Sequence, residues 1–258
     1  MTDSLHIEDT NLSRAWARGF LALMEYGVAE IIPLVVTVKD IADVQSIEMP
    51  SIRQALDQAL LRNDKYSCQT VASTIFPRSL WNPALSRARL FDRYSRILPQ
   101  LRKYRGNAYG LYFERLIAHG PTKVNQIEHI IQTRLNGNRR RSALQAAIFD
   151  PTRDHTNQPL RGFPCMQQVT FAPYGKGKLA VTGFYATQYI FDRAYGNYLG
   201  LLDLGLFVAH ELGLQLTQLN CVTGIALLGD IKKAGIRKDV KQLALKLKTI
   251  IGITYNEN

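Results

Sequence analysis

Cys165 is the residue of this chain best placed to do covalent chemistry. It follows Pro164 and precedes a strand-like run, Val169 to Phe171, so a Pro-Cys turn can present its sulfur beside a strand. A thiolate is a good nucleophile and also a good leaving group. Nearby arginines lower the pKa of a thiol, and Arg161 is close in sequence. The pattern predicts a nucleophilic position, with a buried structural thiol as the alternative.

Three consecutive arginines, Arg139, Arg140 and Arg141, form a second candidate site. They follow Asn136-Gly137-Asn138, a turn-forming run that predicts a loop. Guanidinium groups match phosphate oxygens through paired hydrogen bonds, so this loop suits a phosphate group. We expect one of the three to lie near Cys165 in space. A merely solvated basic turn is the alternative.

Two further polar side chains are candidates. The amide of Asn197 has one acceptor and two donors, which can pair with the edge of a uracil-type base. Because a long apolar segment follows Asn197, the residue also suits a helix N-cap, and the two roles are compatible. Glu114 is a carboxylate that can orient water or relay protons, although exposed glutamates of no function are common.

The order of these motifs resembles the thymidylate synthase superfamily. After Cys165 come a polar hairpin tip at residues 175–178, a strand-like run, and Asn197 before the long apolar segment. Other stretches fit the same order and extend the resemblance over nearly the whole chain: Asn11–Trp16, Ile32–Val36, Tyr109–Arg115 and Arg139–Arg141.

The resemblance implies a fold and a reaction. The fold is α/β (α+β), with one mixed sheet covered by helices in a single domain over residues 1–258. Cys165 attacks carbon six of a pyrimidine nucleotide, and carbon five then accepts a one-carbon unit from a reduced folate, methylenetetrahydrofolate. Tyr109 is the active-site tyrosine, and Gln188 and Asn197 contact the substrate. The arginine triplet reaches the partner subunit's nucleotide, which implies a homodimer with shared active sites.

The chain also departs from the family pattern. The usual Tyr-Gln-Arg-Ser reads Tyr185–Gln188 here and lacks the phosphate-binding arginine. Thr70–Trp81 offers no clear catalytic glutamate, and Asp40–Met49 contains no arginine for a phosphate loop. Met166 replaces the histidine that follows the cysteine, and Tyr255–Asn258 replaces the apolar tail that covers folate. These losses argue against an ordinary thymidylate synthase.

Composition excludes several protein classes. With 258 residues, 46% of them hydrophobic, the chain can bury a large core. Its polar, acidic beginning predicts no secretory signal and a cytoplasmic location. Three widely spaced cysteines fit neither a disulfide framework nor a metal site, and we expect Cys68 and Cys221 to be structural. The scattered histidines likewise predict no bound metal.

The net charge of +11 attracts polyanions of any kind. Nucleic-acid binding is thus a third interpretation, although no recognised RNA or DNA motif supports it.

Periodicity predicts the longer elements. Leu199–Leu216 is apolar but carries Asp203, His210 and Glu211, which indicates a buried core helix rather than a membrane span. Helices are also predicted over Asn11–Gly27, Ser51–Asn63, Leu85–Leu101 and Val124–Leu135, an amphipathic element over Lys232–Lys248, and strands over Ile31–Val38 and on both sides of the hairpin tip.

The sequence therefore predicts a divergent enzyme that forms a Cys165 adduct with a pyrimidine nucleotide and adds a methyl or hydroxymethyl group at carbon five. The alternative is a catalytically silent member of the same fold. Such a protein would sense nucleotides or assemble with another protein, for instance in phage defence.

Overall fold

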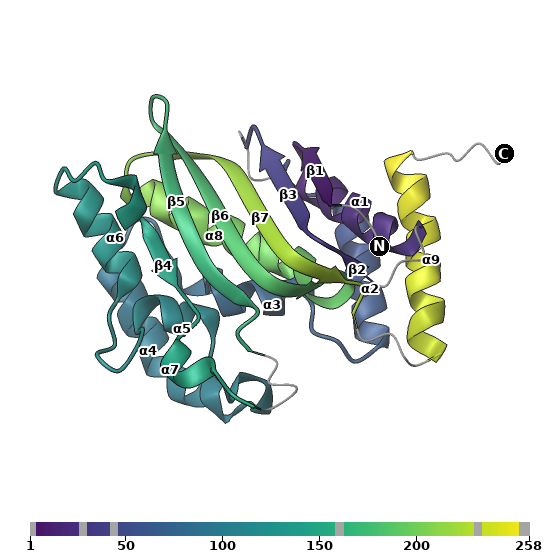
Figure 1. Cartoon of the computed structure of the whole chain (residues 1–258), viewed down its shortest axis with the longest axis horizontal. Coiled ribbons are helices and arrows are strands. Elements are labelled where there is room, and N and C mark those ends of the chain that lie inside the picture. Colours follow the sequence, from purple (N-terminus) through teal and green to yellow (C-terminus); the bar gives the residue numbers. More distant parts are fainter. Residues whose placement is uncertain (1–3, 26–29, 42–45, 158–162, 230–233, 253–258) are drawn as a thin grey trace.

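A computed structural model describes residues 4–25, 30–41, 46–157, 163–229 and 234–252 of the chain (Figure 1). Within these residues seven strands form one mixed sheet in the order β1-β3-β7-β6-β5-β4, with β2 paired to β7. The predicted mixed sheet with helices is therefore confirmed. The strands are β1 (Leu5–Asp9), β2 (Glu30–Ile31), β3 (Leu34–Lys39), β4 (Gln145–Ala147), β5 (Met166–Tyr174), β6 (Lys178–Tyr189) and β7 (Gln215–Leu227).

The predicted hairpin is the connection between β5 and β6, which pair antiparallel. Gly175 and Gly177 at its tip have φ angles of 53° and 73°, a region that glycine enters without steric cost. The next strand, β7, runs parallel to β6 and antiparallel to β3. The predicted strand over Ile31–Val38 is divided between β2 and β3 at Pro33, because proline cannot donate to a ladder.

The longer predicted helices are confirmed within a few residues. The helices are α1 (Leu12–Glu25), α2 (Pro50–Arg62), α3 (Cys68–Ile75), α4 (Arg87–Lys103), α5 (Tyr112–Ile117), α6 (Gln126–Leu135), α7 (Pro151–Asp154), α8 (Tyr195–Glu211) and α9 (Ala234–Ile251). Of the two caps that the sequence allows for α1, Asn11 and Ser13, Asn11 is the one used, since its side-chain oxygen accepts a hydrogen bond from the Arg14 N–H at 3.2 Å. Gly27, the predicted stop of this helix, lies outside the described residues.

Helix α8 is the buried core helix that the sequence predicts, and it ends at Glu211 before β7 begins. It lies behind the sheet in Figure 1 and packs against α3. A Cβ atom at Gly196 would lie 2.6 Å from the carbonyl oxygen of Cys68, and one at Gly200 2.8 Å from that of Ala72. The two glycines therefore allow the backbones of α3 and α8 to touch. No helix in the described part of the chain combines the length and apolarity that a membrane crossing requires.

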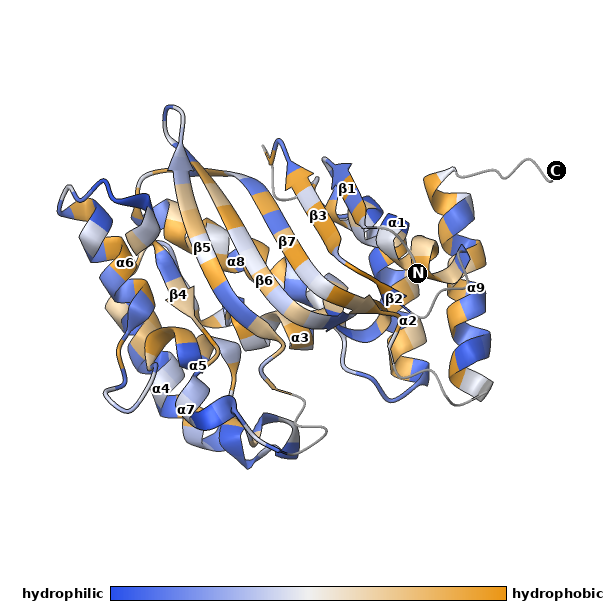
Figure 2. Cartoon of the chain, viewed as in Figure 1, coloured by the Kyte–Doolittle hydropathy of each residue, from blue (hydrophilic) through white to orange (hydrophobic). Residues whose placement is uncertain are grey.

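Helix α9 is amphipathic, as the basic C-terminal stretch predicts. Apolar and polar bands alternate along it in Figure 2, and Val240, Leu243 and Leu247 are buried. It packs against α1 and α2 at the β1 side of the sheet, whereas α4, α5, α6 and α7 lie at the β4 side.

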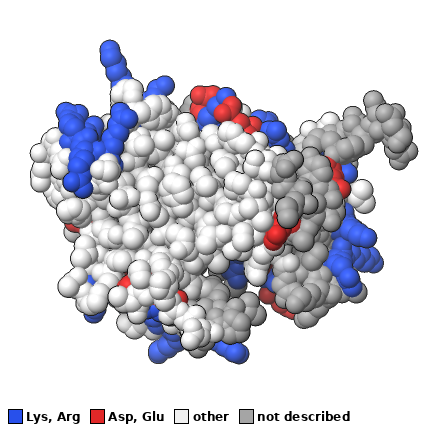
Figure 3. All heavy atoms as spheres, viewed as in Figure 1, with Lys and Arg blue, Asp and Glu red and all other residues white. Residues whose placement is uncertain are grey.

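The face of the sheet opposite α8 carries no helix and is turned to the viewer in Figure 1. Its register aligns Thr170, Thr182 and Asn220 across β5, β6 and β7, and the Asn220 amide donates to the Thr182 hydroxyl at 3.0 Å. Figure 3 shows a broad uncharged surface in this region. We call this surface the open face, and on the central strands it consists of Gln168, Thr170, Ala172, Thr182, Phe184, Asn220 and Val222.

Asp203 of α8 should make stability depend on pH. Burial raises the pKa of Asp203 from 3.8 to about 6, although Arg78, whose Nε lies 3.7 Å away, opposes the shift. The folded protein then holds this proton more tightly than the unfolded chain, so stability falls as pH rises from about 4 to about 6. We expect Asp203→Asn to raise the free energy of unfolding at pH 7.5 by about 1 to 3 kcal/mol.

Urea denaturation at pH 7.5 and below pH 4 tests this expectation, because the difference should nearly vanish at the lower pH, where aspartate is protonated in both states. Asp92→Asn, at an exposed carboxylate paired with Arg96 on the same helix, is the control and should change little. An equal stabilisation by Asp203→Asn at both pH values would contradict the explanation.

Candidate functional site

Cys165 lies directly before β5, with a half-buried side chain. The Phe163–Pro164 peptide that precedes it is cis. The Cys165 carbonyl accepts hydrogen bonds from the Ala186 N–H at 2.9 Å and from the Gln167 amide at 3.1 Å. The backbone of the predicted Pro-Cys turn is thus held against β6, at the end of a strand.

Aromatic side chains surround this turn. The Tyr112 hydroxyl accepts a hydrogen bond from the Met166 N–H at 3.5 Å, and the Tyr112 and Phe163 rings lie 5.1 Å apart. Tyr185 on β6 is 3% exposed, and its hydroxyl has no hydrogen-bond partner among the described residues. The setting is therefore flat-walled and apolar with phenol groups at its edge, which suits an aromatic heterocycle.

Arg193 supplies the positive charge at this site. It stands in a π-helical turn, Ile190–Ala194, between β6 and α8. Its guanidinium carbon lies 5.1 Å from the centre of the Tyr66 ring, and its Nε lies 3.7 Å from a carboxylate oxygen of Asp192. In Figure 3 the surface is hollowed below the sheet, near the place where β5 begins in Figure 1, and a basic side chain lies inside the hollow.

Arg193 was not predicted as a site residue from sequence. Its only signal there was a charged Asp192-Arg193 pair set directly before an apolar segment. π-Helical turns of this kind are frequent at functional sites.

The charge state of Cys165 differs from the sequence-based expectation. Burial raises the pKa of the Cys165 thiol, and the charge of Arg193 only partly lowers it. The expected lowering by Arg139, Arg140 or Arg141 is wrong within one subunit, because these residues lie beyond the far end of β5. That strand has nine residues, so its ends are about 30 Å apart. Arg161 lies outside the described residues.

The Tyr109–Arg115 segment reaches the Cys165 turn, as its place in the resemblance implies. A Cβ atom at Gly110 would lie 3.0 Å from the Phe163 ring. Tyr109 itself is 43% exposed, so it is not a core residue, which the sequence alone also allowed as the simpler interpretation. Its role as the active-site tyrosine stays a prediction.

The interpretation of Glu114 as a proton relay at the site is not supported by its geometry. Its carboxylate forms a close ion pair with Arg102 of α4, whereas Tyr112, two residues earlier on α5, faces the Cys165 turn. Residues two apart on a helix point to different sides. The ion pair of Glu114 with Arg102 therefore connects α5 to α4.

Gln188 and Asn197 are both buried. The Gln188 carbonyl oxygen accepts a hydrogen bond from the Thr223 hydroxyl at 3.2 Å, and its amide nitrogen lies 3.8 Å from the Cys221 sulfur. Both polar atoms of the Gln188 amide are thus engaged with side chains of β7, so the amide is unavailable to a substrate. Asn197 lies within the first turn of α8, so the N-cap interpretation is wrong, and its contact with a base stays a prediction.

The other two cysteines are fully buried, as expected of structural thiols. Burial raises the pKa of Cys68 well above its usual range and that of Cys221 to about 12. Groups of three histidine, cysteine or acidic side chains able to hold a metal ion do not occur among the described residues.

A buried ion pair between Arg115 and Asp154 contacts the segment that leads to Cys165. The Arg115 guanidinium donates two hydrogen bonds to the Asp154 carboxylate, both at 2.9 Å, and one to the Ile148 carbonyl at 3.1 Å. It also lies 5.2 Å from the centre of the Phe163 ring. Arg115 thus connects α5, α7 and the chain that leads to Cys165.

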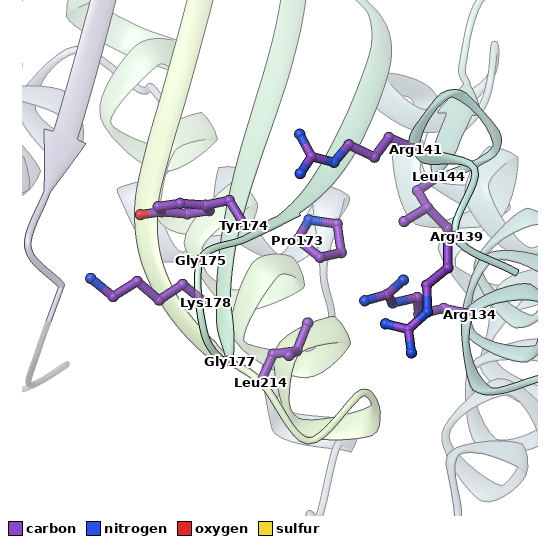
Figure 4. Close-up of a pocket in the computed structure, with 10 residues that line it drawn as sticks. All are labelled: Arg134, Arg139, Arg141, Leu144, Pro173, Tyr174, Gly175, Gly177, Lys178 and Leu214. Carbon is purple, nitrogen blue, oxygen red and sulfur yellow. The ribbon is translucent and has the colours of Figure 1, made fainter. Parts of the chain in front are cut away.

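The predicted arginine loop exists between α6 and a 3-10 turn that begins at Arg141. Arg139, Arg141 and also Arg134 line a pocket of about 230 Å³ against the β5–β6 hairpin, and Arg140 is not among its lining residues (Figure 4). Cys165 and the arginine loop, both predicted from sequence as site residues, therefore lie at opposite ends of β5.

Comparison with known proteins assigns no family to this arrangement, because no protein-family model matches the chain and no curated protein is found to be its relative.

Chemical modification of the native protein tests the Cys165 environment. Iodoacetamide should modify Cys165 and spare Cys68 and Cys221, which are 2% and 1% exposed. Because a cation favours the thiolate, Arg193→Gln should raise the pH at which the alkylation rate of Cys165 is half-maximal.

Arg141→Gln is the matched control. Its charge is about 30 Å from Cys165 along β5, several times the Debye length of roughly 8 Å at physiological salt, so the rate profile should not move. Equal shifts in the two variants, or modification of all three cysteines at one rate, would contradict the assigned geometry. Peptide mass mapping after alkylation gives the site-specific rates.

Proposed function

We propose that the chain is a thymidylate synthase-like enzyme that binds a uracil-type pyrimidine nucleotide beside Cys165 and transfers a one-carbon unit to carbon five of the base. The observation that carries the proposal is the convergence of a half-buried thiol, aromatic rings and a guanidinium at one end of β5. The motif order of the sequence supports the same assignment.

Arg193 replaces the phosphate arginine that the Tyr185–Gln188 segment lacks. Its positive charge lowers the pKa of both Cys165 and Tyr112, although burial of each group outweighs this effect. A charge-assisted hydrogen bond to phosphate contributes about 1.5 to 3 kcal/mol, and in this proposal Arg193 makes that contact.

The base has two candidate polar partners. The unpaired hydroxyl of Tyr185 is buried close to Cys165 and Tyr112, and a buried polar group without a partner costs free energy until a ligand or water pairs with it. The Asn197 amide has the donor and acceptor that a uracil edge requires. Tyr112 and Phe163 supply rings against which a flat base can stack.

The covalent step requires the thiolate of Cys165. Its sulfur adds to carbon six, and the electron pair of the double bond moves to carbon five. Carbon five attacks the electrophilic carbon of a one-carbon donor, whose bond to its carrier breaks and leaves the electron pair on the carrier. A base then takes the carbon-five proton, and the sulfur departs as thiolate, which restores the double bond. Burial opposes thiolate formation and Arg193 favours it, so activity should rise with pH as the thiol ionises.

Neither of the two pockets described, one at the arginine loop and one between α2 and α9, lies at Cys165. The donor of the one-carbon unit is therefore not assigned to any described residue, and methylenetetrahydrofolate stays a prediction of the resemblance.

The second candidate function is a nucleotide-binding protein without turnover, acting as a sensor or within a larger assembly. The raised pKa of the Cys165 thiol favours it, because the neutral thiol is a poor nucleophile. In this case Arg193 and the aromatic residues bind the nucleotide, and Cys165 only fills space.

A mechanism-based inhibitor distinguishes the two functions. With a 5-fluoropyrimidine nucleotide, we expect intact-protein mass spectrometry to show one adduct, and peptide mapping to place it on Cys165. Cys165→Ala should abolish the adduct and Cys68→Ala should retain it. Arg193→Gln should slow its formation about tenfold or more, since one charge-assisted contact is lost.

The control for the lost charge is Arg96→Gln, whose side chain is 75% exposed on α4 and should leave the rate unchanged. Binding that persists in Cys165→Ala without any adduct in the wild type would favour the silent protein. Absence of both binding and adduct for base, nucleoside and nucleotide would refute the pyrimidine assignment altogether.

The open face is the surface we propose for the homodimer. Strands β5, β6 and β7 each have at least nine residues, or about 30 Å, and six strands side by side span a similar width. The resulting area, on the order of 800 Å², matches what each partner buries in a stable interface. The sharing of Arg139, Arg140 and Arg141 between subunits stays a prediction of the resemblance.

A charge in the middle of the open face tests the dimer. Thr182→Arg should convert a dimer into monomers in light scattering, because two buried like charges would face each other across the symmetry axis. Ser73→Arg, on the exposed side of α3, adds the same charge elsewhere and should leave the mass unchanged. Circular dichroism verifies that both variants are folded. A monomeric wild type would refute the interface.

A further inference from the structure

The arginine pocket beside the β5–β6 hairpin is a separate site. It is formed by Arg134 at the end of α6, by Arg139 in the following loop and by Arg141, facing Pro173 and the glycines of the hairpin. In Figure 4 the guanidinium groups of Arg134 and Arg139 lie next to each other, and Arg141 extends above Pro173. Three segments of the chain thus bring three cations around one cavity.

No described acidic side chain balances these charges, and none of the three arginines forms an ion pair with a described residue. By contrast, Arg87 and Arg102 on nearby helices are paired with glutamates. Adjacent like charges repel, and an anion that binds between them removes the repulsion.

We propose that this pocket binds two linked phosphate groups, as in a nucleoside diphosphate or triphosphate. The paired guanidinium groups of Arg134 and Arg139 match the oxygens of one phosphate, and Arg141 lies at a second position suited to its neighbour. A cavity of about 230 Å³ is smaller than the roughly 300–1,000 Å³ of sites for drug-sized ligands. It holds the phosphates, and the rest of the ligand lies outside.

This site goes beyond the proposed function, because it uses neither Cys165 nor a second subunit. It lies about 30 Å from Cys165 along β5, and no residue near the thiol lines it. Arg139 and Arg141 are also residues that the resemblance assigns to the partner subunit's nucleotide, whereas this pocket would hold its ligand within one subunit and without a pyrimidine. Binding of pyrophosphate by Cys165→Ala therefore tests this site apart from the proposed reaction.

Isothermal titration with inorganic pyrophosphate tests the proposal, and it is carried out on the wild type and on Cys165→Ala. We expect both proteins to bind, and Arg134→Gln or Arg139→Gln to weaken binding about tenfold or more, as expected for loss of a charge-assisted contact. Arg140→Gln removes the same charge from the same loop but not from the pocket, and it should change the affinity less than twofold. Orthophosphate should bind more weakly than pyrophosphate.

Three results would overturn the proposal. An equal loss of affinity in Arg140→Gln would show diffuse attraction by a basic surface. Equal affinity for orthophosphate and pyrophosphate would exclude two linked phosphates as the ligand. Tighter binding of a single-stranded oligonucleotide, with a steep decrease of affinity in salt, would assign the surface to nucleic acid instead.

Discussion

The buried ion pair between Arg115 and Asp154 is the constraint on which the Cys165 end of the molecule depends. Their side chains are 1% and 0% exposed, so each charge has lost its water and is stabilised by the other and by nearby backbone groups. The Ile148 carbonyl accepts a hydrogen bond from Arg115, and the Asp150 N–H donates one to Asp154 at 2.8 Å. Removing one partner of such a pair costs roughly 3 to 5 kcal/mol, because an uncompensated charge remains buried. The pair joins α5 and α7, and the guanidinium supports the Phe163 ring two residues before Cys165. The position of the thiol thus depends on a charge pair that does not itself touch it.

The two ends of β5 have opposite character. At its beginning a neutral, half-buried thiol lies among aromatic rings with one guanidinium nearby. At its end, arginines without acidic partners surround an open pocket. Between the two ends the open face carries uncharged side chains (Figure 3). This separation explains how one strongly basic chain offers an apolar setting for covalent chemistry and a cationic setting for phosphate without mixing them.

Long periodic segments were predictable because their burial pattern repeats over several turns. The apolar stripes of α1, α2 and α6, the hairpin with its glycines and the all-round apolarity of α8 each carry enough residues to define a period. Short elements were not predictable. α5 and α7 have six and four residues, fewer than a hydrophobic period can establish. β4 has three residues and is defined by its pairing with β5.

By itself, the sequence determined the mixed α/β class, the presentation of Cys165 before a strand and the exposure of the arginine loop, since each depends on local chemistry within a few residues. Only the tertiary structure decided which charges meet. It brought the charge of Arg193, in a π-helical turn, to bear on the thiol, rather than that of Arg139, Arg140 or Arg141. It also paired Glu114 with Arg102 and used the Gln188 amide inside the sheet. The physical reason is that electrostatic contacts are set by distance in space, which no spacing along the chain specifies.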